Sequence, residues 1–419
     1  MNRVVTLGGG AAALAVFIVF HHLWRGPPPP TFASAFFYFC GVLAAVSITV
    51  SRRGNDWSHL PPARGRTVVV IPAFNEPDEM LHRTIASLLA GSVVPDVLYV
   101  VDDGSARPIA PFDHPKVVWR RQGNTGKRRA QVAALAGEIA SRTADFLVTV
   151  DSDCVLERDC LRECLRPLSD PRVQAATATP TVLNRTENLL TRLIDLEIVT
   201  SCLVTRGLRS RVGAVSPTSG AMSVYRAGLL FENVDDYVAS GTIGDDRRLS
   251  HYALLRGKVV AVESAMVETL APASLRGLYL QRDRWYRGYF RYLTWELRHL
   301  HGMALAFRCW NFLLVVLYPV IMGWAFLVVP LAGGQVYAEA LVYWLALMYC
   351  QTVRYVAYDR PGMPLGERVV TWLAGTPLLI LYNLVVLRVA IYRAVTRAGR
   401  THWQTRGDPV PGVLVGGEA

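Results

Sequence analysis

Short apolar runs alternate with helical stretches between about residues 67 and 270 of the chain. The near-continuous apolar runs at Thr67–Pro72, Val97–Val101 and Phe146–Val150 are typical of buried strands. Residues 78–90 and 127–140, which lie between these runs, have the pattern of helices. Such alternation predicts an α/β fold with a mostly parallel sheet, in which ligands bind at the carboxyl ends of the strands.

Runs without a charged residue precede this region. Residues 4–24 and 31–50 are separated by Arg25 and four prolines, and each run has about the length that crosses ~30 Å of hydrocarbon. A signal peptide is the alternative for the first run, but no clear cleavage site follows it. The two runs are therefore predicted to be a pair of transmembrane helices. Basic residues then place the next domain in the cytoplasm, namely Arg52, Arg53, Arg64 and Arg66.

Further uncharged runs follow at 309–338, 340–353 and 369–387, after an aromatic-rich amphipathic stretch from Tyr279 to Leu300. The amphipathic stretch is predicted to lie in the membrane interface, and the uncharged runs to cross the membrane. Three crossings would leave a basic C-terminus outside the cell, against the positive-inside rule. Either one run is re-entrant, or 309–338, with its two internal prolines, crosses more than once.

Composition supports a membrane protein and argues against a nucleic-acid partner. Hydrophobic residues make up 52% of the chain and charged residues 18%, with a mean hydropathy of +0.26. The net charge of +11 fits cytoplasmic loops against anionic lipid. Basic residues are scattered, and no nucleic-acid recognition motif accompanies them. The seven cysteines lack metal-type spacing and are predicted to be reduced and structural.

Acidic residues follow two of the predicted strands directly. Asp102 and Asp103 begin Asp-Asp-Gly-Ser, and Asp151 and Asp153 enclose Ser152. Residues two apart in an extended segment point the same way, so Asp151 and Asp153 can share one face. Two carboxylates there can hold Mg²⁺ or Mn²⁺, with diphosphate oxygens completing the coordination. The alternative is that Asp-Ser-Asp is a turn and helix cap.

Two further turns carry groups suited to a nucleotide. Pro72–Glu76 ends the first strand, where Phe74 can pack against a base and Glu76 can hydrogen-bond to it. An ordinary strand-to-helix turn is the alternative there. Gly123–Arg128 is a glycine-rich turn that opens a helix, and its N–H groups together with Lys127 suit a phosphate. It is not a Walker motif, and short Gly-Lys turns are common.

Gly244-Asp245-Asp246-Arg247 precedes a helical run over 248–255. Helix capping is the ordinary role of such an acidic pair. A sugar-transfer site also needs a carboxylate that removes the proton of the acceptor hydroxyl, and the two roles are compatible.

Gln281, Arg284 and Trp285 have the spacing i, i+3 and i+4, which places them on one face of a helix. Gln281 and Arg284 can hold a diphosphate, because the Arg fork makes paired hydrogen bonds. Trp285 offers a flat face to a sugar ring. An aromatic residue at the membrane interface is the alternative reading of Trp285, and the two are compatible.

The ordered set of motifs resembles the processive, inverting membrane glycosyltransferases, a family that includes hyaluronan, chitin and cellulose synthases. The resemblance covers about residues 68–290 and includes Ser219-Gly220-Ala221. Gly126-Lys127-Arg128, Leu183–Asn188 and Trp403–Gly407 resemble hyaluronan synthases and nodulation-type chitin-oligosaccharide synthases in particular, with Gln404 a departure from the usual glycine. The resemblance implies a glycosyltransferase domain of the nucleotide-diphospho-sugar transferase (GT-A) type.

The resemblance also implies roles for individual residues. Uridine would be contacted by Asp102 and Asp103 together with Phe74 and Glu76, and further candidate substrate-binding residues are Lys127, Asp245 and Arg247. Asp153, helped by Asp151, would bind Mg²⁺ or Mn²⁺. Asp246 would be the general base, Gln281 and Arg284 would hold the pyrophosphate, and Trp285 would line the acceptor site.

These expectations divide the chain into five parts. A transmembrane pair (1–55) precedes a cytoplasmic glycosyltransferase domain (56–275) and interfacial helices (276–303). A C-terminal transmembrane region (304–395) and a cytoplasmic tail (396–419) follow. The predicted protein is an integral plasma-membrane enzyme that transfers GlcNAc, alone or with glucuronate, from a UDP-sugar to a growing β-linked polysaccharide. The alternatives are a non-processive transferase acting on a lipid or short acceptor, and a nucleotide-binding transporter or sensor.

Overall fold

The computed structural model describes residue 42 and residues 56–241, 243–323, 327–333 and 338–397. The predicted spans at 4–24 and 31–50, Val42 apart, lie outside the described residues, and so does the Trp403–Gly407 motif.

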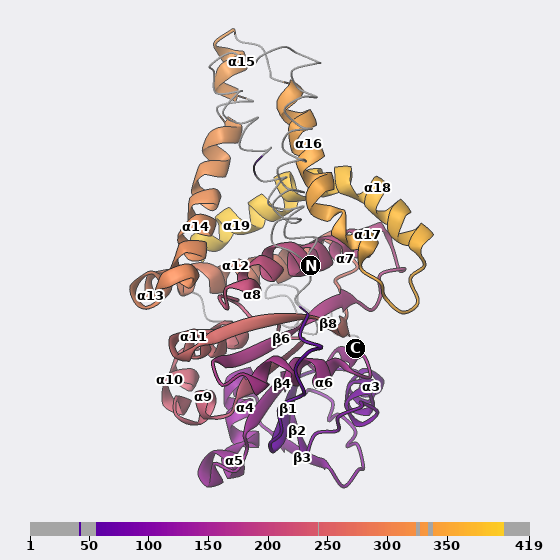
Figure 1. Ribbon diagram of the computed structural model, residues 1–419, viewed down its shortest axis with the longest axis vertical. Coiled ribbons are helices and arrows are strands. Elements are labelled where there is room, and N and C mark those ends of the chain that lie inside the picture. The colour runs from indigo at the N-terminus through magenta and orange to yellow at the C-terminus, as the bar shows by residue number, and fades with distance from the viewer. Residues whose placement is uncertain (1–41, 43–55, 242, 324–326, 334–337, 398–419) are drawn as a thin grey trace, which may run out of the picture.

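One eight-stranded sheet forms the centre of the domain, in the order β3-β2-β1-β4-β7-β6-β8-β5 (Figure 1). The strands β3, β2, β1 and β4 are mutually parallel, β7 is antiparallel to both of its neighbours, and β6 is parallel to β8. This confirms the predicted α/β class with a mostly parallel sheet. The bounds are β1 Thr67–Ala73, β2 Val97–Asp103, β3 Val117–Gln122, β4 Phe146–Val150, β5 Cys154–Leu156, β6 Val173–Val182, β7 Met222–Arg226 and β8 Lys258–Thr269.

Helices cover both faces of this sheet, which explains the near-continuous apolar character of its central strands. All residues of β1 and β4 are buried. One apolar core packs the sheet against α3 (Asp78–Leu89) and α6 (Cys160–Leu165). A second core packs the other face against α4 (Lys127–Ala134), α9 (Gly228–Phe231), α10 (Val234–Ala239) and α11 (Asp245–Arg256). The predicted helix 127–140 is divided at Leu135 into α4 and α5 (Ala136–Ser141).

The remaining helices lie beyond the β6–β8 side of the sheet, and α14 and α16 project away from the domain (Figure 1). The amphipathic stretch predicted at 279–300 forms α12 and α13. Within the described ranges, no helix combines the length and apolar character needed to cross a bilayer. The predicted C-terminal spans therefore stay predictions. The bounds are α7 Leu189–Thr200, α8 Gly207–Arg211, α12 Leu275–Arg291, α13 Leu293–His299, α14 Gly302–Gly323, α15 Val329–Leu331, α16 Ala338–Thr352, α17 Arg354–Ala357, α18 Leu365–Tyr382 and α19 Arg388–Val395, with π-helices at Ser201–Arg206 and Asn383–Leu387.

Two carboxylates of α7 join the domain to the C-terminal helices. Asp195 is fully buried and accepts two hydrogen bonds from Arg360, at 2.8 and 2.9 Å. Glu197 pairs with Arg282 of α12 at 2.6 Å and accepts a hydrogen bond from the Tyr382 hydroxyl of α18 at 2.9 Å. A third apolar core surrounds these pairs. The helices therefore hold α12, with its candidate site residues, against the domain.

Candidate active site

Asp102 and Asp103 end β2, and both are buried. Asp103 accepts hydrogen bonds from the N–H groups of Thr125 at 3.0 Å and Gly126 at 2.8 Å, so it shapes the glycine-rich turn. Asp102 accepts from the N–H of Ser105 at 2.9 Å and lies 3.3 Å from Arg121 Nε. Both carboxylates therefore organise the loops at this edge of the sheet. Their predicted contact with uridine stays a prediction.

The Pro72–Glu76 turn connects the two acidic motifs. The Asn75 N–H donates to Ser105 Oγ at 2.8 Å, which links the turn to Asp-Asp-Gly-Ser. Ser152 Oγ donates to Glu76 at 3.0 Å, which links it to Asp-Ser-Asp. Phe74 is partly exposed beside these contacts. The strand ends predicted to carry the site therefore do meet.

Lys127 brings three motifs together. Its ammonium lies 2.7 Å from Asp151 Oδ1 and 2.8 Å from Asp245 Oδ2. Burial alone would lower the pKa of Lys127, but the two carboxylates outweigh burial and raise that pKa well above its ordinary value. Gly220 completes the arrangement, because a Cβ at that position would lie 2.7 Å from Asp151 Oδ2. Four motifs therefore meet around Lys127 and Asp151, namely the Gly-Lys turn, Asp-Ser-Asp, Ser-Gly-Ala and Gly-Asp-Asp-Arg.

Asp245 and Asp246 form the first turn of α11 but have different environments. Burial raises the pKa of Asp246 to about 6, and the adjacent Asp245 carboxylate adds to this rise. Burial acts in the same direction on Asp245, but Lys127 outweighs it and lowers the pKa of Asp245. Neighbouring carboxylates with pKa values driven apart mark candidate acid–base groups. Asp246 is the one suited to accept a proton near neutral pH.

Arg128 holds the loop in front of these aspartates. Its guanidinium is buried and donates to the carbonyl oxygens of Tyr237, Ile243 and Gly244 at 3.0, 3.0 and 2.8 Å. It also donates to the Tyr292 hydroxyl at 2.9 Å. Sequence reasoning noticed Arg128 only as part of Gly-Lys-Arg and gave it no role. A buried arginine that satisfies carbonyl groups is a positioning group.

Helix α12 turns its predicted binding face toward this loop. A Cβ at Gly288 would lie 3.3 Å from Ile243, and Tyr292 reaches Arg128. Gln281 and Arg284 precede Gly288 by seven and four residues, so they lie on the same side of the helix. Gln281 Oε1 is buried and has no hydrogen-bond partner among the described residues.

Trp285 is 46% exposed, and the guanidinium of Arg282 lies 4.2 Å from its ring centroid. Arg282 itself is fixed by Glu197. The sequence pattern missed Arg282, because its partner comes from the distant helix α7. Trp285 is thus a flat side chain that is free on one face and supported on the other.

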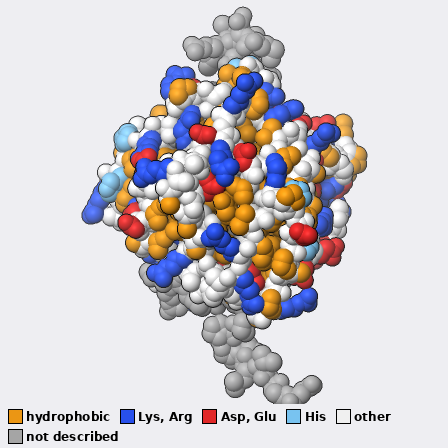
Figure 2. Space-filling model, turned by 90° about the horizontal axis from the view of Figure 1, so that it is seen from below, with side chains coloured by type: hydrophobic (Ala, Val, Ile, Leu, Met, Phe, Trp, Pro, Cys, Tyr) orange, Lys and Arg blue, Asp and Glu red, His pale blue; other side chains and the backbone are white. Residues whose placement is uncertain are grey.

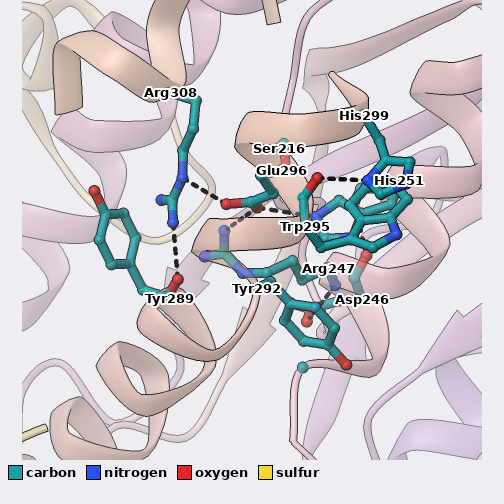
Figure 3. A network of polar contacts seen from close by, with 12 residues as sticks. Ser216, Asp246, Arg247, His251, Tyr289, Tyr292, Trp295, Glu296, His299 and Arg308 are labelled. Atoms are coloured by element: carbon teal, nitrogen blue, oxygen red, sulfur yellow. Dashed lines mark hydrogen bonds and ion pairs between the residues drawn. The ribbon is translucent and has the colours of Figure 1, made fainter. Parts of the chain in front are cut away.

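Arg247 pairs within the protein. Its Nη1 donates to Glu296 at 2.9 Å, in a buried network that also contains His251 and Arg308 (Figure 3). The predicted contact of Arg247 with substrate stays a prediction. Glu296 was not foreseen from sequence, since it lies 49 residues from Arg247.

The candidate metal ligands are Asp151 and Asp153. Within the described part of the chain, no three His, Cys, Asp or Glu side chains are grouped as a ready metal site. Mg²⁺ is commonly bound by one or two carboxylates together with substrate phosphates and water, so a pair of partly exposed aspartates fits it. The hard oxygen donors fit Mn²⁺ as well.

Acidic strand ends, a Gly-Lys turn and the Gly-Asp-Asp-Arg motif meet at one end of a mostly parallel α/β sheet, the arrangement expected of a glycosyltransferase domain of the GT-A type. The family model described as glycosyltransferase like family 2 matches residues 62–288, more than half of the chain. The protein belongs to glycosyltransferase family 2. This confirms the family suspected from the motifs.

Known proteins extend the comparison. Hyaluronan synthase of Streptococcus pyogenes is 32% identical over 275 residues, 60% of this chain and 65% of that protein. An N-acetylglucosaminyltransferase of Bradyrhizobium diazoefficiens is 34% identical over 247 residues, 55% of this chain and 50% of that protein. The match thus spans less than two thirds of either relative. The mannosyltransferase PcManGT from Pyrobaculum calidifontis, solved with GDP-Man and Mn2+, gives a TM-score of 0.48 at 17% identity, covering 87% of this chain and 97% of that chain.

Proposed function

We propose that the protein transfers a sugar, GlcNAc alone or with glucuronate, from a UDP-sugar to a growing β-linked polysaccharide with inversion at the anomeric carbon. The observation that carries the proposal is the convergence of Lys127, Asp151 and Asp245 beside Asp246. The similarity to a hyaluronan synthase and an N-acetylglucosaminyltransferase supports this donor class.

The reaction is a single displacement. Asp246 accepts the proton of the acceptor hydroxyl as that oxygen attacks the anomeric carbon, and UDP departs from the opposite face. Gln281 and Arg284 bind the diphosphate, and Trp285 stacks on the acceptor sugar. Mg²⁺ or Mn²⁺ held by Asp151 and Asp153 would stabilise the negative charge on departing UDP. Phe74, Glu76, Asp102 and Asp103 border the nucleoside.

The polymer would leave through the C-terminal helices, with the catalytic domain on the cytoplasmic side of the plasma membrane. Exposed apolar side chains along α14 support contact with lipid, among them Trp310, Leu313, Leu314, Val316 and Leu317. A nucleic-acid partner is not proposed. On the face seen in Figure 2, Lys and Arg side chains are distributed among acidic and apolar ones.

The test is incubation of membranes containing the full chain with labelled UDP-sugars and Mg²⁺ or Mn²⁺. A high-mass product that glycosidases degrade supports a polysaccharide synthase. A lipid-soluble labelled product would instead identify a transferase with a lipid acceptor. UDP binding without turnover of any UDP-sugar would point to a transporter or sensor.

Gly220→Ala is expected to reduce transfer about tenfold. The new Cβ would lie 2.7 Å from Asp151 Oδ2 and displace that carboxylate, and displacing a group of the site by about 1 Å can cost up to about 100-fold in rate, so a smaller shift should cost about tenfold. The measurement is kcat/KM for the UDP-sugar at saturating Mn²⁺. Gly137→Ala is the control, because its Cβ on exposed α5 meets nothing within 4 Å. Equal activity of the two variants would contradict the prediction.

A further inference from the structure

Glu296 of α13 is the centre of a buried charge network between α11, whose first turn contains Asp245 and Asp246, and α14 (Figure 3). Its side chain is 1% exposed. Arg247 Nη1 donates to Oε1 at 2.9 Å, and His251 Nε2 lies 2.9 Å from the same oxygen. Arg308 of α14 places its Nε 2.5 Å from Oε2. One carboxylate therefore joins α11, α13 and α14.

The network has a defined protonation state. Burial lowers the pKa of His251 to about 4, so the ring is neutral near pH 7 and its Nε2–H donates to the carboxylate. Burial opposes ionisation of Glu296, but Arg247 and the other partners outweigh it and lower the pKa of Glu296 to about 2. The His251 ring also stacks on Trp295, with 4.5 Å between centroids. Glu296 is thus a permanent anion between two arginines.

The same network reaches the base. The Arg247 N–H donates to Asp246 Oδ1 at 2.7 Å, so the residue whose side chain is held by Glu296 also orients the Asp246 carboxylate. The backbone oxygen of Asp246 is fixed separately by Ser250 Oγ at 2.7 Å. Arg308 makes a second anchor on α12, because it donates to the Tyr289 carbonyl oxygen at 2.8 Å and lies 3.7 Å from that ring's centroid.

We infer that Glu296 is a positioning residue that sets the geometry of Asp246 through Arg247, and that Arg308 makes this geometry depend on the docking of α14. The inference rests on the proposed function, in which Asp246 is the general base. The three partners of this buried acid come from two neighbouring helices: Arg247 and His251 from α11, which carries Asp246, and Arg308 from α14.

Glu296→Gln in the full chain is expected to lower kcat about 10- to 100-fold, the effect of misplacing a catalytic group by about 1 Å. UDP affinity should change little, because the residues proposed to border the nucleoside lie at the ends of β1 and β2. The charged and titratable groups near Asp246 are Asp245, Lys127, Arg247 and Tyr225. Loss of the Glu296 charge leaves Arg247 free to stabilise ionised Asp246, so the acidic limb of the kcat profile should move to lower pH.

Asp195→Asn is the matched control. Asp195 is equally buried and pairs with Arg360, and its other partners are the Val182 N–H at the end of β6 and the Tyr355 hydroxyl of α17. The Asp195→Asn substitution should lower the melting temperature of the protein without shifting the acidic limb of its kcat profile. If Glu296→Gln keeps wild-type kcat, or loses activity with an unmoved limb as a merely destabilised protein would, the inference is wrong.

If Glu296→Gln folds poorly, two further variants still test the inference: Arg308→Gln, and the double variant that carries both substitutions. Arg308→Gln should also lower kcat, and the double variant should lose less than the product of the two single losses, because both act on one contact. Independent, multiplicative losses would overturn the coupling to α14. Absence of transfer in the wild-type chain, or full activity of Asp246→Asn, would instead sink the proposed function.

Discussion

Asp246→Asn is expected to reduce sugar transfer about 1000-fold while leaving UDP affinity nearly unchanged. Asparagine has almost the same shape and can still accept the hydrogen bond that the Arg247 N–H donates at 2.7 Å. It cannot accept the proton of the acceptor hydroxyl, and general-base catalysis contributes about 10²- to 10⁴-fold. The measurement is kcat with UDP-sugar, together with calorimetric titration of UDP.

The pH profile of the wild-type protein tests the same assignment. A base must be deprotonated to act, and burial raises the pKa of Asp246 to about 6. The rate should therefore be fully present above pH about 7 and fall as the pH drops through about 6. Asp235→Asn, at an exposed position of α10, is the control for charge removal nearby and should keep both the rate and the profile. Substantial activity of the Asp246→Asn variant would show that another residue is the general base.

Removal of divalent metal should reduce transfer more than about 100-fold, with recovery on addition of Mg²⁺ or Mn²⁺. Departing UDP carries negative charge, and metal ions stabilise such charge by several kcal/mol. Asp151 and Asp153 are the ligands that the chain offers at the strand end. The measurement is the initial rate after chelation with EDTA and after titration of each metal.

Lys127 is the competing source of positive charge. Its ammonium already lies within 2.8 Å of both Asp151 and Asp245, where it can face a diphosphate without metal. Asp153→Asn separates the two explanations, because it weakens a metal site without touching the Lys127 ion pairs. A raised metal requirement in this variant supports metal use. If turnover is undiminished in EDTA, Lys127 rather than a metal ion provides the positive charge that stabilises departing UDP.

The central fold follows from local pattern. The strand predicted at Phe146–Val150 is observed with those bounds, and β1 and β2 extend the predicted strands by one and two residues. All three are near-continuous apolar runs in a sheet that is covered on both faces, which leaves few alternatives. The position of β7, antiparallel between β4 and β6, has no such local signal, because it depends on the path of a chain that returns from α8.

The site was predictable where residue type alone implies chemistry. An acidic residue directly after a strand suggested Asp151, and an acidic pair at the start of a helix suggested Asp246. The structure places the motifs of both residues together through Lys127. The roles of Arg128 and Glu296 were not predicted from the sequence, because these roles depend on partners that are distant along the chain. Arg128 reaches Gly244 over 116 residues, and Glu296 reaches Arg247 over 49. Spacing in the sequence carries no trace of such contacts.

The carboxylates of α7 also decide where the polypeptide can be shortened. A fragment ending near residue 303 would lose Arg360 and Tyr382, and water would then reach Asp195 and Glu197. Rehydration would relieve the charges, but the buried side chains of Leu193 and Leu196, which pack against Gly375 of α18, would become an exposed apolar surface. An excised catalytic fragment should therefore aggregate, and purification calls for the whole polypeptide.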